Sequence, residues 1–207
     1  MTIYGATWPV TSDVHPTATM GTTPFSFDRS DPLRPVRKQV RGGVCIGEHV
    51  EIFAHANVDR GIERDTVLHD YVKVDHFAHI GHDSIIGQGT VVCAHAVICG
   101  YVEVGEGCYI GAGAMIKPRL KIGAGAKIGM GAVVLCDVPA GEVWVGVPAR
   151  CIRHRTVRWP GLVIPDIGHP SHCVNRGDLE HRLCNCGAFE RLMVPGEVWA
   201  GNPARRI

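Results

Sequence analysis

A branched aliphatic residue recurs at every sixth position through the middle of the chain, twelve times in succession. These residues are Leu68, Val74, Ile80, Ile86, Val92, Ile98, Val104, Ile110, Ile116, Ile122, Ile128 and Val134. A short internal period of this kind predicts a solenoid, in which each coil stacks on the coil before it. Three six-residue rungs make one triangular coil, so the aliphatic side chains are expected to fill its interior.

The position four residues after each aliphatic residue is mostly small, as a tight corner of the coil requires. At a spacing of one coil, Ala78, Ala96, Ala114 and Ala132 form a single stacked column. Neighbouring coils lie one strand spacing apart, roughly 4.8 Å. The expected fold class is therefore all-β, a parallel β-helix followed by an irregular C-terminal extension.

Three regions follow from this pattern. Residues 1–40 are rich in Pro, Thr and Asp and are expected to form an N-terminal segment with a partial first coil. Residues 41–139 hold the regular repeat and should form the main β-helix, with the candidate catalytic residues on it. Residues 140–207 are expected to form a C-terminal cap and a tail that contains Cys and His.

Composition excludes several classes of function. The net charge is +1, so no global field favours nucleic acid or a membrane surface. No apolar run is long enough to span a bilayer, and the N-terminus does not read as a signal peptide. The nine cysteines are an odd number, and several lie within coils. This usage is typical of the reducing cytoplasm, which is the expected location.

The repeat is interrupted once, between Val58 and Leu68, where ten residues replace six or twelve. The intervening segment must leave the regular coil, and such loops often lie beside a site. Asp59, Arg60 and Asp65 are therefore expected near an acceptor cleft, where they would bind hydroxyl, ammonium or phosphate groups. The alternative is a loop held together by its own Asp–Arg pair.

Histidines cluster on the coils, and one of them has a distinctive neighbour. Gly100 lies eighteen residues after His82 and is therefore stacked one coil above it. A backbone N–H at Gly100, with no side chain in the way, could face a reacting carbonyl beside the imidazole. A general base next to an oxyanion donor is the minimum machinery for acyl transfer. Asp83 or a neighbouring acid is expected to hold the imidazole ring and to stabilise its protonated form.

The repeat ends in a decamer that recurs near the C-terminus. Residues 141–150 read GEVWVGVPAR and residues 196–205 read GEVWAGNPAR. The first copy is expected to cap the last coil with its tryptophan, and the reason for the second copy stays open. The segment between them contains His and Cys residues that could bind a structural metal, although an untethered tail is the preferred interpretation.

Eight short motifs occur in order between residues 14 and 87. They are His15-Pro16-Thr17-Ala18, Pro24-Phe25-Ser26-Phe27, Val44-Cys45-Ile46-Gly47-Glu48-His49-Val50-Glu51-Ile52, Val58-Asp59-Arg60-Gly61, Asp65-Thr66, Val74-Asp75-His76, Ile80-Gly81-His82-Asp83 and Ile86-Gly87. This series resembles the UDP-3-O-acylglucosamine N-acyltransferases of the lipid A pathway, over roughly residues 14–135. The stretch from His79 to Asp83 is closer to the sister family, the UDP-N-acetylglucosamine O-acyltransferases.

The resemblance implies a left-handed parallel β-helix and a homotrimer with active sites in clefts between subunits. The family's catalytic histidine falls on His82 and its oxyanion glycine on Gly100. A second family histidine falls on Arg119, which we expect to bind the acceptor together with His76 and His79. The family's N-terminal uridine-binding domain is not expected in this chain. The acceptor implied is a sugar or sugar nucleotide.

The expected reaction is direct attack of an amine or hydroxyl on a thioester, with His82 accepting the proton and no metal taking part. The donor is expected to be acyl coenzyme A or an acyl carrier protein. Lys117, Lys121 and Lys127 provide a basic stretch for a pyrophosphate or an acidic carrier. The ending at residues 146–150 resembles that of coenzyme A-dependent acetyltransferases, which favours acetyl or another short acyl group.

Two other classes of function stay open. The γ-class carbonic anhydrases share this fold and need three zinc histidines, two of them five residues apart on one coil. Here the residues five positions after His82 and His95 are glycines, which disfavours a catalytic zinc site. The second alternative is a non-catalytic trimeric scaffold, which substitution of His82 would distinguish from an enzyme.

Overall fold

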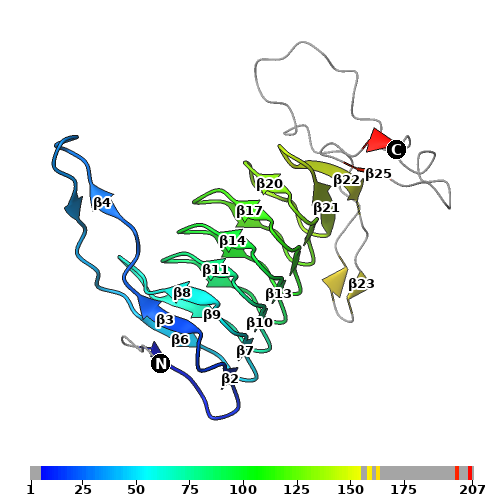
Figure 1. Ribbon diagram of the computed structural model, residues 1–207. Coiled ribbons are helices and arrows are strands. Elements are labelled where there is room, and N and C mark those ends of the chain that lie inside the picture. Colours follow the sequence, from blue (N-terminus) through cyan, green and yellow to red (C-terminus); the bar gives the residue numbers. More distant parts are fainter. Residues whose placement is uncertain (1–5, 155–157, 160–161, 164–198, 201–204, 207) are drawn as a thin grey trace.

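The computed structural model describes residues 6–154, 158–159, 162–163, 199–200 and 205–206. Triangular coils stack along one axis, with the N-terminal coil at one end and the cap at the other (Figure 1). The described residues form strands and turns, and none of them lies in a helix that could cross a membrane. The fold class is all-β, as the sixfold period predicted.

Three sheets form the three sides of the coils. Sheet 1 contains β1 (Ala6–Thr7), β6 (Val44–Ile46), β9 (Thr66–Leu68), β12 (Ile85–Ile86), β15 (Glu103–Val104) and β18 (Lys121–Ile122). Sheet 2 contains β2 (Asp13–Val14), β7 (Glu51–Ile52), β10 (Lys73–Val74), β13 (Val91–Val92), β16 (Tyr109–Ile110), β19 (Lys127–Ile128), β21 (Glu142–Val145) and β22 (Arg150–His154). Sheet 3 contains β3 (Thr19–Thr22), β8 (Asn57–Asp59), β11 (His79–Ile80), β14 (Val97–Ile98), β17 (Met115–Ile116) and β20 (Val133–Val134).

Strand register follows the coil length. In sheet 3, His79 pairs in parallel with Val97, and Val97 pairs with Met115, each eighteen residues on. Below that level, Asn57 pairs with His79, which is twenty-two residues on. The four extra residues belong to the interruption at residues 60–65, between β8 and β9. The interruption therefore enlarges one corner and leaves the sheets in register.

The predicted aliphatic positions form the core. All twelve side chains are at most 3% exposed, and so is the column of four alanines at the corner. Each coil buries a ring of branched aliphatics against the rings above and below, and burial of such a side chain contributes about 1.5–3 kcal/mol. The outward positions of the same strands remain free to carry chemistry.

The solenoid begins earlier than the sequence pattern predicted. Strands β1, β2 and β3 pair with the next coil in all three sheets, so the first coil is complete and not partial. Met20 lies six residues after Val14, and Ala18 occupies the small corner position. An antiparallel arm, β4 (Phe27–Asp28) with β5 (Val36–Arg37), extends from the connection between β3 of the first coil and β6 of the second (Figure 1). Its Pro- and Asp-rich sequence concealed the repeat.

The first decamer closes the last coil, as expected. Strand β21 pairs with β19 and then turns back as β22, and Trp144 is 3% exposed beneath this hairpin. The Trp144 Nε1–H donates to Glu142 Oε2 at 2.7 Å, which satisfies two buried polar groups at once. Two short pairs follow, β23 (Arg158–Trp159) with β24 (Leu162–Val163) and β25 (Trp199–Ala200) with β26 (Arg205–Arg206). The Cys- and His-containing part of the tail lies outside the described residues.

Candidate functional site

One corner of the solenoid carries most of the candidate residues. It connects sheet 3 to sheet 1, and the interruption at residues 60–65 lies at this corner one coil before His82. Gly100 and Tyr101 occupy the same corner on the next coil, and Arg119 on the coil after that. Residues far apart in the sequence are thus stacked at intervals of one strand spacing.

His82 and Asp83 form a directly hydrogen-bonded pair at this corner. The distance from His82 Nδ1 to Asp83 Oδ2 is 2.8 Å. The imidazole side chain is 18% exposed, whereas the carboxylate is fully buried. A carboxylate can only accept, so His82 Nδ1 carries the proton and Nε2 of the neutral ring keeps a free lone pair. The pair therefore presents a base with a fixed tautomer.

Asp83 also holds the interruption in place. The backbone N–H groups of Ile62, Glu63 and Arg64 all donate to its carboxylate at 2.8 Å. Burial raises the pKa of Asp83, but the N–H donors from the loop and the His82 ring outweigh it and hold this pKa below 3.8. Asp83 is therefore an ionised group that links His82 to the loop.

Asp83→Asn is expected to lower the free energy of unfolding by about 1–3 kcal/mol at neutral pH, since an amide cannot accept all of these hydrogen bonds. The carboxylate's contribution is present above its unfolded pKa and is lost as the pH falls through the lower folded pKa. Urea unfolding of both proteins should therefore show a difference near neutrality that shrinks below pH 3.8. Equal stability at neutral pH would contradict this role.

Gly100 lies against the imidazole ring. A Cβ atom built on Gly100 would lie 2.6 Å from both Cε1 and Nε2 of His82, closer than real side-chain contacts allow. The Gly100 N–H has no backbone acceptor among the described residues, while its carbonyl accepts from the Arg119 N–H. The sequence analysis identified Gly100 as a candidate because of its backbone N–H. The structure shows in addition that only glycine at this position leaves room for the imidazole ring.

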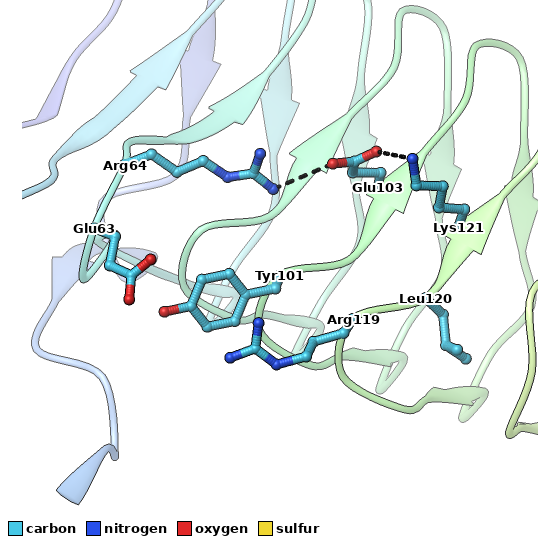
Figure 2. A pocket seen from close by; sticks show the side chains of 7 residues that line it. All are labelled: Glu63, Arg64, Tyr101, Glu103, Arg119, Leu120 and Lys121. Carbon is cyan, nitrogen blue, oxygen red and sulfur yellow. Dashed lines mark hydrogen bonds and ion pairs between the residues drawn. The ribbon is translucent and has the colours of Figure 1, made fainter. Parts of the chain in front are cut away.

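A polar hollow of about 360 Å³ lies at this corner, and its lining includes Tyr101 and Arg119 but neither His82 nor Gly100. Its walls are drawn in Figure 2: Tyr101 lies between Glu63 and Arg119, and Arg64 points across towards Glu103 and Lys121. The Tyr101 ring meets His82 edge-on, with centroids 5.0 Å apart. The Arg119 guanidinium lies 4.2 Å above the Tyr101 ring centroid, a cation–π contact. Tyr101 therefore contacts both the hollow and His82, and it separates the hollow from the imidazole ring.

The charges around the hollow are mixed. Glu103 forms ion pairs with Arg64 at 3.5 Å and with Lys121 at 3.3 Å, and all three side chains are substantially exposed. Burial and the charges of Asp83 and Glu63 raise the pKa of Tyr101. Sequence reasoning did not select the lining residues Glu63, Arg64, Tyr101 and Glu103. Tyr101 could have been found from the coil length, because Asp83, Tyr101 and Arg119 follow one another at steps of eighteen residues.

A second polar cluster lies on sheet 3 beside the same corner. Asp59 is 6% exposed, and its Oδ1 accepts from Thr22 Oγ1 at 2.6 Å and from Asn57 Nδ2 at 2.9 Å. Asn57 Nδ2 also lies 3.1 Å from His79 Nδ1, and His79 Nε2 lies 3.7 Å from Asp59 Oδ2. Asp59 and His79 are thus brought together on the approach to His82.

Arg60 and Asp65 hold the base of the loop. Arg60 Nε–H donates to the Gly42 carbonyl at 2.8 Å, and Asp65 Oδ1 accepts from the Gly43 N–H at 2.6 Å. The alternative of an Asp–Arg pair within the loop is wrong, because each side chain binds the backbone of residues 42–43. Asp65 remains exposed on its outer side.

Other predicted residues lie apart from His82 within one chain. His76 is at the corner between sheets 2 and 3, with its Nδ1 2.7 Å from Asp75 Oδ1. The predicted basic stretch is divided: Lys117 is on the His82 corner, Lys121 on sheet 1 and Lys127 on sheet 2. A consecutive stretch in a β-helix is spread around its sides, so of these three lysines only Lys121 lines the hollow.

The described residues contain no group of three or more His, Cys, Asp or Glu side chains placed to hold a metal ion. His82 and His79 are each paired with a carboxylate instead. The chemistry that the corner supports is proton transfer by a positioned imidazole.

Comparisons with known proteins agree with this geometry. The profile described as bacterial transferase hexapeptide (six repeats) matches residues 65–100 and 101–136. A UDP-3-O-acylglucosamine N-acyltransferase from Sinorhizobium fredii is 46% identical over 140 residues, which are 68% of this chain and 40% of the relative. The chain spans less than half the length of the curated relatives it matches.

Solved structures show the same fold. The acetyltransferase domain of PglB from Neisseria gonorrhoeae, in complex with acetyl coenzyme A, has a TM-score of 0.56 and 27% identity, over 69% of this chain and 58% of that one. LpxA from Acinetobacter baumannii has a TM-score of 0.61 and 22% identity, over 68% and 52% of the two chains. The expected left-handed parallel β-helix is confirmed. Residues 65–136 are therefore similar in sequence to the bacterial transferase hexapeptide repeats.

Proposed function

We propose that the protein transfers an acyl group from a thioester to an amine or hydroxyl of a sugar or sugar nucleotide, with His82 as general base. The observation that carries this proposal is the His82–Asp83 hydrogen bond, which leaves Nε2 free on the side of the ring that packs against Gly100. The acyltransferase names of the relatives support the same class of reaction.

The steps balance without a covalent enzyme intermediate. The acceptor nitrogen or oxygen attacks the thioester carbonyl and forms the new C–N or C–O bond, while His82 Nε2 takes the acceptor proton. Collapse of the tetrahedral intermediate breaks the C–S bond, and the imidazolium returns the proton to the leaving thiolate. Asp83 stabilises the imidazolium and keeps its own charge throughout. These steps require no metal.

Gly100 is proposed to supply the oxyanion donor. Gly100 packs against the ring, and its N–H has no backbone acceptor among the described residues. A donor aimed at the developing oxyanion typically contributes about 3–4 kcal/mol to transition-state stabilisation. His82 and Gly100 are one coil apart. The imidazole can therefore accept the acceptor's proton while the Gly100 N–H binds the carbonyl oxygen of the same reacting pair.

The acceptor is proposed to enter the hollow beside Tyr101. Arg119 and Arg64 would bind phosphate or ring oxygens, and Glu63 a hydroxyl or ammonium group. Asp59 and His79 line the approach on sheet 3, whereas Arg60 and Asp65 serve mainly by holding the loop. His76 could contribute from a neighbouring subunit.

The donor is proposed to be a short-chain acyl coenzyme A. Lys121 lines both the hollow and a second groove of about 580 Å³ that continues over β15 and β18 to residues 137–140. Lys117 and Lys121 would meet the pyrophosphate, whereas Lys127 lies on another side. The PglB relative holds acetyl coenzyme A. An acyl carrier protein is the alternative donor, and the reducing cytoplasm is the proposed location.

The protein is further proposed to be a homotrimer, with each site completed by a neighbouring subunit. Sedimentation equilibrium at micromolar concentration should give three times the chain mass of 22.4 kDa. Because the hollow is open on its outer side, a shared site would also explain how a sugar is enclosed. A monomer at all accessible concentrations would contradict the shared site.

A donor and acceptor panel tests the function. Purified protein is incubated with acetyl and longer acyl coenzyme A and with a set of amino sugars and sugar nucleotides. The expected result is thiol release that depends on one acceptor class, together with the acylated product in the mass spectrum. Absence of acceptor-dependent release across the panel, with folded protein, would favour a non-catalytic scaffold.

A further inference from the structure

The interruption binds Asp83 through three consecutive backbone N–H groups, which together surround the carboxylate. Ile62 N–H donates to Oδ2, and the N–H groups of Glu63 and Arg64 donate to Oδ1, all at 2.8 Å. Successive N–H groups pointing into one concavity form an anion-binding arrangement. Here the anion is the chain's own carboxylate, which also accepts from His82.

The local sequence enforces this arrangement. A Cβ atom on Gly61 would lie 1.4 Å from the Arg64 carbonyl oxygen, so the turn that aims the three N–H groups closes only over glycine. On the other side, Asp83 has a left-handed φ of 58°, and its N–H donates to the buried Thr66 Oγ1 at 2.9 Å. Both ends of the loop therefore contribute to the placement of one carboxylate.

Two of these three residues also contribute to the hollow. The side chains of Glu63 and Arg64 line it (Figure 2), while their N–H groups bind Asp83. Arg64 Nε–H additionally donates to the Asp83 carbonyl at 3.1 Å. Residues 63–64 thus form part of the wall of the hollow and also support the imidazole through Asp83.

We infer that residues 61–64 are a positioning element for the base: the N–H groups of residues 62–64 fix Asp83 so that His82 keeps Nε2 free, and the side chains of Glu63 and Arg64 bind the acceptor. The inference rests on the proposed acyl transfer by His82. It assigns the insertion a role in catalysis that acts through Asp83, and it explains why four extra residues occur at this corner alone among the regular coils from Val44 to Val134. Displacement of the N–H groups should then disturb the imidazole even when every side chain at the site is retained.

Gly61→Ala tests this role. In protein labelled with ¹⁵N-histidine, His82 Nδ1–H should give a slowly exchanging resonance, assigned by its loss in His82→Ala. Gly61→Ala is expected to remove or broaden this resonance and to lower kcat about ten-fold or more, with the KM for the thioester unchanged. A folded Gly61→Ala protein that keeps both the resonance and kcat would overturn the inference.

Gly111→Ala is the matched control, because its Cβ would also meet backbone atoms, at 2.7 Å, but at the corner between sheets 2 and 3. It should leave the His82 resonance and kcat unchanged. Arg64→Gln keeps its N–H and should raise the acceptor KM with the resonance intact; loss of the resonance there would count against a role for the backbone.

Thr66 variants carry the test if Gly61→Ala does not fold. Thr66→Val removes the acceptor of the Asp83 N–H and should weaken the resonance and kcat together, while Thr66→Ser should restore both. Unchanged values in Thr66→Val would overturn the inference. If no variant or wild-type protein transfers an acyl group, the proposed function fails separately, because the resonance reports positioning without turnover.

Discussion

His82→Ala is expected to lower the rate of acyl transfer by about 10²–10⁴-fold, the range typical of a lost general base. The fold should persist, because the ring lies at a corner and contributes nothing to the core. The KM for the thioester should change little, since the imidazole acts on the acceptor proton. Steady-state kinetics with the identified acceptor, together with thermal unfolding, measure both effects.

His95→Ala is the matched control. His95 lies at the corner between sheets 2 and 3, where its ring stacks on that of Phe77 with centroids 5.0 Å apart. Its backbone has a left-handed φ of 58°. It is also a coil histidine, but it is exposed whereas His82 is partly buried, and it has no carboxylate partner among the described ion pairs. Its removal should leave turnover within a few fold of wild type. Near-normal turnover by His82→Ala would show that the base is a different group.

Gly100→Ala is expected to lower kcat by about 10²-fold, although it adds one methyl group. That methyl group would lie 2.6 Å from His82 Nε2, so the ring must move, and a displacement of about 1 Å can cost this much. The Gly100 N–H is retained, and glycine at this position has no left-handed φ. Loss of activity should therefore reflect displacement of the imidazole.

The double variant separates this explanation from a general disturbance. In the His82→Ala background the ring is absent, so Gly100→Ala should cost almost nothing further, because the two effects pass through one contact. Multiplicative losses in the double variant would instead indicate that the methyl group damages donor binding or the fold. Kinetics of the four proteins of this cycle, at saturating donor, give the answer.

The sequence predicted the core of this fold and its stacking. An interior ring at a spacing of six residues leaves little freedom, and all twelve positions from Leu68 to Val134 are buried as expected. The prediction failed at the N-terminus, where Val14 and Met20 are followed by the arm rather than by another rung. A single coil fragment carries too few repeats for the period to be recognised.

Within the candidate site, the sequence predicted the contacts that depend only on the stacking of regular coils. His82 and Gly100 lie eighteen residues apart in regular coils, so their proximity follows from the period. Glu63 and Arg64 lie in the interruption, where the period gives no information, and their positions depend on hydrogen bonds to Asp83. Arg60 and Asp65 were expected to face the acceptor, but their polar groups are used by the backbone at residues 42–43. Loop side chains bind the nearest unpaired backbone groups, which the sequence cannot locate.

A crystal structure of the protein with coenzyme A and its acceptor would show whether His82 is placed to act as the base. We expect the acceptor amine or hydroxyl to lie about 2.6–3.2 Å from His82 Nε2, within reach of proton transfer. We also expect the rest of the acceptor to occupy the hollow between Glu63 and Arg119, with the coenzyme thiol near Gly100. An acceptor bound at another corner, with His82 Nε2 facing solvent or a structural hydrogen bond, would contradict the account.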